Sequence, residues 1–205
     1  ASALSFYAVE ETEETEKQES TPFLVDPVLM ENSNEYIFVF DKADSCLKVV
    51  DKALNDFRSE NYVFKTNFVP TNILVVNNYV LLYDHESGTI QCLNSQDFTE
   101  YEIDATLSTI LDTSFKFETI QIGGKDMLLV CPENPIENVF NLIEFDNVSD
   151  ENHIQIKGKT QFKISNRFTN FSAYDHIFAC QKDENLFLML LNNDSILSFE
   201  YDLST

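Results

Sequence analysis

One two-strand unit recurs along this chain, and it limits the possible folds more than any other feature of the sequence. In residues 77–96, an apolar run is followed by a polar segment with one glycine, then by an alternating run that ends at turn-forming residues. Runs of this kind, bounded by Asn, Asp, Gly and Ser, are typical of two β-strands joined by a tight turn. The same arrangement occurs in residues 34–52, 124–147 and 184–205. The sequence therefore predicts four β-hairpins.

The spacing of the hairpins indicates how they are organised. Their second strands end near Asp51, Asn94, Asp146 and Asp202, at intervals of 43, 52 and 56 residues. Periods of about 40–50 residues with several strands each are typical of propeller blades. With the strand candidates between the hairpins, the chain holds about sixteen strands, enough for roughly four four-stranded blades. We expect an all-β, propeller-like array of about four antiparallel blades, alone or within a larger propeller; the alternative is a β-sandwich.

Two finer expectations concern the core. Leucines at similar places in three hairpins are expected in equivalent buried positions: Leu81, Leu128 and Leu188. One short helix is expected after Asp104, where apolar residues recur at helical spacing in residues 107–111. Helix is otherwise scarce in this sequence.

The beginning of the chain resembles its end. The segment "ALSFYAVE", residues 3–10, is similar to "ILSFEYDL", residues 196–203. A chain that opens with the sequence of a last strand would begin within a blade. We therefore expect residues 1–205 to form a single propeller-like domain or fragment, and we expect any unclosed sheet edge to invite pairing with another chain.

The hairpins resemble degenerate repeats of the WD-repeat β-propeller family. "SGTIQCLN" and "NDSILSFEYD" are similar to the final hairpin of that family, in which a turn with Asp or Gly precedes an alternating strand ending near Trp-Asp. The chain departs from the pattern because it has no Trp and only one such turn carries glycine, at Gly88. Phe, Tyr and aliphatic packing would replace the usual hydrogen-bond network. The resemblance implies a rigid platform that binds protein partners.

The charge balance indicates the kind of partner. The chain has 13 Lys and Arg residues against 35 Asp and Glu residues, for a net charge of −22. Such a surface repels phosphate, so direct nucleic-acid binding is not expected, whereas a protein with a basic surface would be attracted. We expect a hetero-oligomer with protein partners of that kind.

An acidic loop in residues 10–21 is the candidate partner-binding segment. It contains no apolar residue that a core would bury, and the alternative is a solvated insertion between strands. The glutamates expected to contact a basic partner are Glu10, Glu11, Glu13, Glu14, Glu16 and Glu19.

No pattern in the sequence indicates catalysis. Of the three histidines, His85 lies in a polar turn between Asp84 and Glu86 and His176 follows Asp175, which is typical of exposed histidines, and no nucleophile elbow, zinc-protease or EF-hand motif occurs. Four glycines are too few and too scattered for a phosphate-binding loop. We therefore expect no enzymatic activity, no catalytic residues, no cofactor and no metal site.

The cysteines indicate the cellular compartment in which the protein acts, because disulfides and free thiols occur in different compartments. Cys46, Cys92, Cys131 and Cys180 are widely spaced and lie in or beside apolar strands, where a free thiol behaves as a small hydrophobe. We expect reduced thiols and an intracellular location, in the nucleus or the cytoplasm. The apolar runs are strand-sized and far shorter than the roughly 20 residues of a membrane span.

Three functions are compatible with these features. The first is a non-catalytic scaffold subunit that mediates protein–protein interactions in a multi-subunit complex, such as one for nuclear RNA processing, transport or chromatin. The second is an acidic, chaperone-like binder of a basic client protein. The third is an extracellular ligand-binding β domain, in which the four cysteines would form disulfides.

Overall fold

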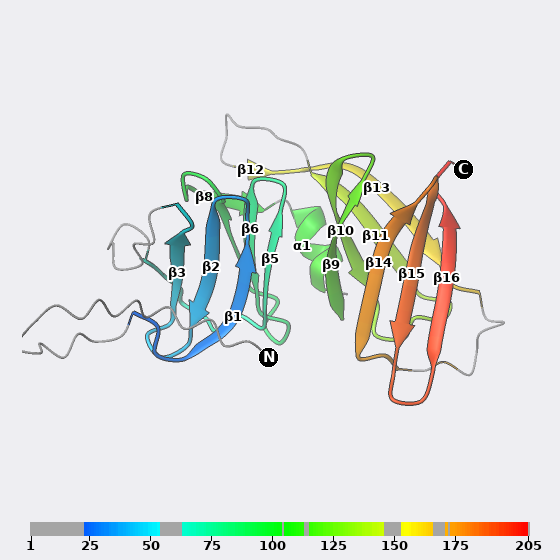
Figure 1. Ribbon diagram of the computed structural model, residues 1–205, viewed down its shortest axis with the longest axis horizontal. Coiled ribbons are helices and arrows are strands. Elements are labelled where there is room, and N and C mark those ends of the chain that lie inside the picture. The colour runs from blue at the N-terminus through cyan, green and yellow to red at the C-terminus, as the bar shows by residue number, and fades with distance from the viewer. Residues whose placement is uncertain are drawn as a thin grey trace, which may run out of the picture.

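The computed structural model describes residues 23–53, 63–103, 105–112, 115–145, 153–165, 171 and 173–204. The described residues form β-strands β1 to β16 and one helix, α1. The strands make four sheets that follow one another along the chain (Figure 1), and all their pairings are antiparallel apart from that of β12 with β8. The expected all-β fold of antiparallel, blade-like sheets is confirmed.

The first two sheets are meanders, in which strands adjacent in sequence are adjacent in space. The first contains β1 (Pro27–Asn32), β2 (Tyr36–Asp41), β3 (Cys46–Asp51) and β4 (Val63–Lys65). The second contains β5 (Asn72–Val76), β6 (Tyr79–Tyr83), β7 (Ile90–Asn94) and β8 (Glu100–Ile103), with the short β12 (His153–Ile154) added beside β8.

The third and fourth sheets follow the same plan. The third contains β9 (Lys116–Ile122), β10 (Lys125–Cys131), β11 (Val139–Phe145) and β13 (Ile156–Lys163). The fourth contains β14 (His176–Lys182), β15 (Asn185–Leu191) and β16 (Ile196–Asp202). Within the described residues, the fourth sheet therefore has three strands, against four in the first and third sheets and five in the second.

All four predicted hairpins are present. They are β2–β3, β6–β7, β10–β11 and β15–β16. Their second strands end at Asp51, Asn94, Phe145 and Asp202, within one residue of the expected positions. The sheets therefore recur at the interval that the sequence predicts.

Side-chain hydrogen bonds explain why Asp and Asn mark the strand ends. Asn94 Oδ1 accepts the backbone N–H of Gln96 at 2.8 Å, and Asp84 Oδ1 accepts that of Glu86 at 3.2 Å. These bonds satisfy backbone donors where the ladder stops and so favour a turn. Four residues after Asp84 the chain adopts φ 68° at Gly88, and four residues after Asn94 it adopts φ 61° at Phe98. A left-handed turn of this kind therefore forms here even without glycine.

Apolar faces hold the sheets together in series. One buried cluster joins the first and second sheets, a second joins the second and third, and a third joins the third and fourth. The middle sheets are covered on both faces, so β6 is buried at each of its five positions. Each interface resembles that of a β-sandwich, in which two sheets pack face to face.

The three leucines expected in the core are buried, but they are not equivalent. Leu81, Leu128 and Leu188 have exposed fractions of 1%, 0% and 0%. Leu128 and Leu188 each face the preceding sheet, whereas Leu81 faces the following one. Side chains alternate along a strand, so an offset of one residue between hairpins moves a side chain to the other face.

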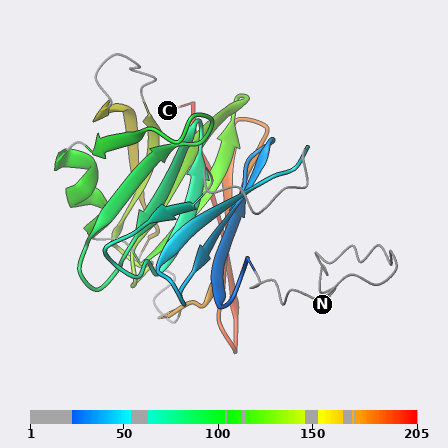
Figure 2. The ribbon, with the colours of Figure 1, turned by 90° about the vertical axis from the view of Figure 1, so that its left-hand side faces the viewer.

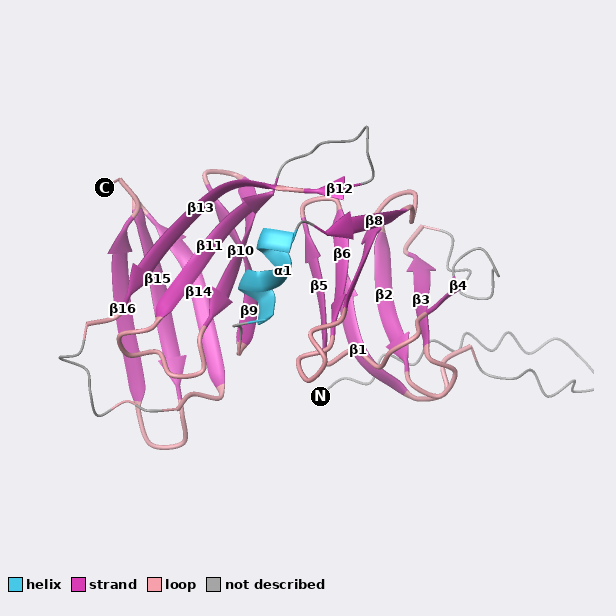
Figure 3. Cartoon of the chain, turned by 180° about the vertical axis from the view of Figure 1, so that it is seen from behind, coloured by secondary structure: helices cyan, strands magenta, loops and turns pink. Residues whose placement is uncertain are grey.

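Helix α1 (Ala105–Asp112) fills the space between the second and third sheets. Its buried residues are Leu107, Ile110 and Leu111, the three that the helical spacing predicts. Figures 2 and 3 show the helix beside the stacked sheets, between β5 and β9 in the rear view. The expected cap, Asp104, lies outside the described residues. The Tyr83 hydroxyl donates to the Leu111 carbonyl at 3.0 Å and so ties the helix to β6.

A buried ion pair secures the first sheet. Lys48 Nζ lies 2.9 Å from Asp41 Oδ2, and the two side chains are 5% and 0% exposed. The Asp41 carboxylate also accepts the backbone N–H groups of Val25 and Asp26, at 2.8 and 2.9 Å. Burial by itself raises the pKa of Asp41, but these hydrogen bonds outweigh it and lower the pKa to about 2. The segment before β1 is thereby fastened to β2 and β3.

The first and fourth sheets lie at opposite ends of the long axis (Figure 1). No buried cluster of described residues joins them. The described array is therefore open at both ends.

We expect Leu128→Ala and Leu188→Ala each to reduce the free energy of unfolding by about 2–5 kcal/mol, because each leaves a cavity between packed sheets. Urea unfolding followed by circular dichroism measures this. Val69→Ala is the control, since Val69 is 47% exposed and should change stability by less than about 0.5 kcal/mol. Losses below about 1 kcal/mol at both leucines would contradict their place in the core.

We expect Asp41→Asn to destabilise the chain at neutral pH, because it removes the buried charge partner of Lys48 and leaves only the half-exposed Asp44, whose Oδ2 lies 2.8 Å from Lys48 Nζ. Since that second carboxylate remains, the loss should be smaller than the about 3–5 kcal/mol that a buried charge left without any partner costs. The folded-state pKa of Asp41 lies below the ordinary value, so its contribution is complete above pH 4 and is lost as the pH falls towards 2. The stability difference between wild type and variant should shrink over that window. A difference independent of pH would contradict the ionised pair.

Candidate functional site

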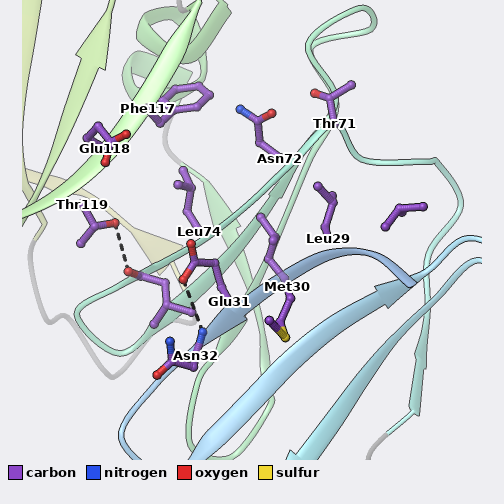
Figure 4. A pocket seen from close by; sticks show the side chains of 13 residues that line it. Leu29, Met30, Glu31, Asn32, Thr71, Asn72, Leu74, Phe117, Glu118 and Thr119 are labelled. Atoms are coloured by element: carbon purple, nitrogen blue, oxygen red, sulfur yellow. Dashed lines mark hydrogen bonds between the residues drawn. The ribbon is translucent and has the colours of Figure 1, made fainter. Parts of the chain in front are cut away.

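The first strands of neighbouring sheets converge and enclose a pocket. β1, β5 and β9 line it, and its volume is about 610 Å³. Figure 4 shows Leu29, Leu74 and Phe117 together with polar side chains of the same three strands, among them Glu31, Asn72 and Glu118. The hydroxyl of Thr119 on β9 donates to the Val75 carbonyl on β5 at 3.2 Å, which links two of the walls.

Two glutamates give the pocket its electrostatic character. Glu31 comes from β1 and Glu118 from β9, and both are partly buried. Burial raises the pKa of Glu118, the negative charge of Glu31 raises it further, and the positive charge of Lys116 opposes both. The two carboxylates therefore repel each other, and a cation between them would relieve that repulsion.

The chemistry available in the pocket is that of hydrogen-bond acceptors. The described lining contains no His, Cys, Lys or Arg, so its polar side chains are carboxylates, amides and hydroxyls. Two carboxylates, the Asn72 amide and the Thr71 hydroxyl offer oxygen atoms to a donor. In the described part of the chain, no three His, Cys, Asp or Glu side chains gather as a metal site would require. A positively charged donor would complement this set of acceptors.

A second candidate site is the outer face of the fourth sheet, here named the end face. The other face of this sheet packs on the third sheet, and the burial of β15 alternates strictly along the strand. The side chains at the alternate positions of β14, β15 and β16, which do not pack on the third sheet, therefore point outward. They form an apolar centre made of Phe178, Cys180, Phe187, Met189, Leu191 and Ile196.

The end face is exposed and has one polar end. Phe178 is 55% exposed and Ile196 is 62% exposed. At the opposite end of the strands, Lys182 Nζ lies 3.9 Å from Glu200 Oε1, and the Asn185 amide donates to Glu200 at 3.3 Å. An apolar centre beside charged residues is typical of protein-binding surfaces.

The cysteines divide between the core and the end face. All four are free thiols; Cys46, Cys92 and Cys131 are buried, whereas Cys180 is partly exposed. Burial raises the pKa of the three buried thiols, most strongly those of Cys92 and Cys131. The expectation of reduced thiols agrees with this arrangement.

The acidic loop of residues 10–21 lies outside the described residues. The structure therefore tests none of its predicted contacts, and Glu10, Glu11, Glu13, Glu14, Glu16 and Glu19 remain a prediction from the sequence. The pocket and the end face were not identified from the sequence. A signal for the end face was present in the alternation of β14 to β16, which leaves apolar residues on both faces.

No protein-family model matches the chain, and no curated protein matches it. Solved structures do. Hydrazine synthase of Kuenenia stuttgartiensis aligns with a TM-score of 0.53 and 12% identity over 94% of this chain and 50% of the matched chain. The extracellular domain of a hybrid two-component system of B. thetaiotaomicron aligns with a TM-score of 0.45 and 12% identity, over 86% of this chain and 23% of that one.

The likeness to hydrazine synthase shows a shared all-β fold. This chain spans half the length of that matched chain. Among the described residues, no helix is long and apolar enough to cross a membrane.

We expect Glu31→Gln to lower the pKa of Glu118, because it removes the like charge while burial continues to hold that pKa above its ordinary value. Side-chain carboxyl titration by NMR measures the shift. Because its folded-state pKa is raised, Glu118 opposes folding once it ionises, so the variant should be the more stable protein at neutral pH. Glu86→Gln, an exposed change in the β6–β7 turn, should leave the pKa of Glu118 unaltered.

We expect one thiol of the native protein to be alkylated rapidly and three only on unfolding, since three are buried with raised pKa values. Mass spectrometry after timed alkylation identifies them. Cys180→Ser should remove the rapid reaction. Fewer than four reactive thiols in the denatured, unreduced protein would contradict the free state of the cysteines.

Proposed function

We propose that this chain is a non-catalytic, propeller-like scaffold that holds protein partners within a multi-subunit assembly. The observation that carries the proposal is the end face, an exposed apolar sheet surface at one end of the array of packed sheets. Each of the three interfaces inside the array buries one apolar sheet face against another, which supports the proposal that a partner covers the exposed one.

Charge supports a basic partner. The chain carries a net charge of −22, and exposed negative charge steers a basic protein towards it. The pocket adds a specific acceptor, because Glu31 and Glu118 repel each other unless a cation lies between them. A lysine or arginine side chain supplies that cation. Such a scaffold would act inside the cell, in the nucleus or the cytoplasm, where free thiols are stable.

The test is affinity purification of a tagged chain from the cells that naturally express it. We expect the double variant Phe178→Lys, Met189→Lys to lose partners that wild type retains, because it places two charges in the apolar centre of the end face. Both residues point outward, so the melting temperature should be nearly unchanged. Val69→Lys is the matched control, since Val69 is also an exposed apolar residue but lies between β4 and β5.

Two readouts decide the outcome. Partners retained by wild type and Val69→Lys but lost by the double variant assign the interaction to the end face. Alkylation of Cys180 should also slow in the purified assembly, because that thiol lies on the same face. Equal retention by all three proteins, with unchanged Cys180 reactivity, would contradict the proposal.

A further inference from the structure

Strand β16 is the outermost strand of the fourth sheet, and its outer edge has no strand beside it in the described chain. We propose that this edge binds an extended segment of a partner protein as a fourth, antiparallel strand, and that the segment is apolar at alternate positions with a lysine or arginine opposite Glu200. This inference rests on the proposed function and names how the partner is held.

The position of β16 in its sheet supports the inference. β3, β7 and β11 are the third strands of their sheets, and each is covered by a fourth strand. β16 is likewise a third strand, reached through a hairpin of the same kind. The described fourth sheet therefore has counterparts of the first three strands of the other sheets, and it lacks a counterpart of their fourth strands, β4, β8 and β13.

The backbone of β16 presents bonding groups at this edge. The Leu203 N–H donates to the Glu184 carbonyl at 2.9 Å, and the Ser195 carbonyl accepts from the Asn192 N–H at 3.1 Å. In an antiparallel strand, the backbone N–H and C=O groups of every second residue bond to the same neighbouring strand. Leu203 and Ser195 bond to the chain beside β15, so the odd-numbered residues of β16 between them also bond to β15. The N–H and C=O groups of Ile196, Ser198 and Glu200 consequently point outward, towards an added strand.

The outer edges of the other sheets are protected, whereas that of β16 is not. β4 has three residues and β12 has two, too few to template a partner. The edge strand β13 is longer, but it carries exposed Lys157, Lys159 and Lys163, and its pairing with β11 shifts register. Lysines and irregular register are the usual means by which proteins block edge pairing. β16 has seven residues in unbroken register with no Lys or Pro.

The side chains of β16 define the segment that fits. Leu197, Phe199 and Tyr201 face the third sheet, where Tyr201 stacks on Phe162 with ring centroids 4.8 Å apart. Phe199 and Tyr201 are only partly buried, so apolar side chains of an added strand would cover them. On the end face, Ile196 favours an apolar neighbour and Glu200 a basic one, because directly opposed residues interact across strands.

Charge selects a partner protein rather than a second copy of this chain. Two copies would each bring a net charge of −22, and their repulsion opposes association. A segment with lysine or arginine opposite Glu200 instead gains an attractive cross-strand pair. Strand addition next to the apolar centre would also extend the end face into a larger binding surface.

The experiment measures binding of a fluorescent peptide, Lys-Val-Lys-Val-Thr-Val-Val, to the full chain by anisotropy. In the antiparallel register its third residue lies opposite Glu200 and its fifth opposite Ser198. Changing the third residue to Glu should weaken binding on the order of tenfold, and Glu200→Lys should restore binding of the changed peptide. Glu200 has a 47% exposed side chain, so the variant should fold normally.

Methylated peptides provide matched controls. A methyl group on the fifth peptide nitrogen removes a donor aimed at β16 and should weaken binding about tenfold or more, whereas a methyl group on the fourth points away and should be tolerated. Ser198→Pro removes the matching donor from the protein. That N–H faces away from β15, so the hairpin should persist, as circular dichroism can verify.

The outcomes separate this inference from the proposed function. Binding with the expected charge and methylation pattern supports strand addition. Equal binding of both methylated peptides, or no effect of Ser198→Pro, would overturn it, and loss of natural partners in the double end-face variant would then still support the scaffold. Dimers that form in wild type but not in Ser198→Pro would assign the edge to a second copy and overturn the partner segment.

Discussion

The structure depends on the packing of one sheet face against the next. A strand carries side chains on both faces of its sheet, so a strand that is apolar at every position is fully buried only where another sheet covers each face. β6 and most of β10 meet this condition because the second and third sheets lie between others. Helix α1 lies between the second and third sheets of this series, and the pocket is lined by the first strands of three successive sheets.

Much of this arrangement could be predicted from the sequence, because hairpins are local. Alternation, turn-forming residues and their intervals predicted the four hairpins, and helical spacing predicted α1. The face on which a residue lies was less predictable, as Leu81 shows. Its orientation depends on an offset of one residue, which the drifting interval between hairpins does not define. Packing between sheets that are distant in sequence decides the offset, and the local alternation of side chains carries no information about that packing.

The pocket and the end face differ in how far the sequence could predict them, because the pocket depends on distant strands and the end face on three consecutive ones. Glu31 and Glu118 come together only because β1 and β9 approach the same pocket, and among 35 acidic residues no spacing distinguishes this pair. The end face had a local signal, since β15 is apolar at alternate exposed positions as well as at buried ones. The sequence of β15 alone does not tell whether a further sheet covers its second face, because that depends on the whole array. The apolar residues at its exposed positions could therefore not be assigned to a surface in advance. The acidic loop stands out in composition, yet its contacts lie outside the described residues.

The open array has a consequence for cooperativity. Sheets that contact only their neighbours behave approximately as a one-dimensional series, in which a terminal unit is stabilised by one interface and an internal unit by two. The β14–β16 sheet has one described interface, so its amide protons should exchange through local opening more readily than those of β6 or β10. The proposed partner, by covering this sheet, would supply the second interface. Binding would then be read out as slower exchange across an entire sheet, including residues that the partner never touches.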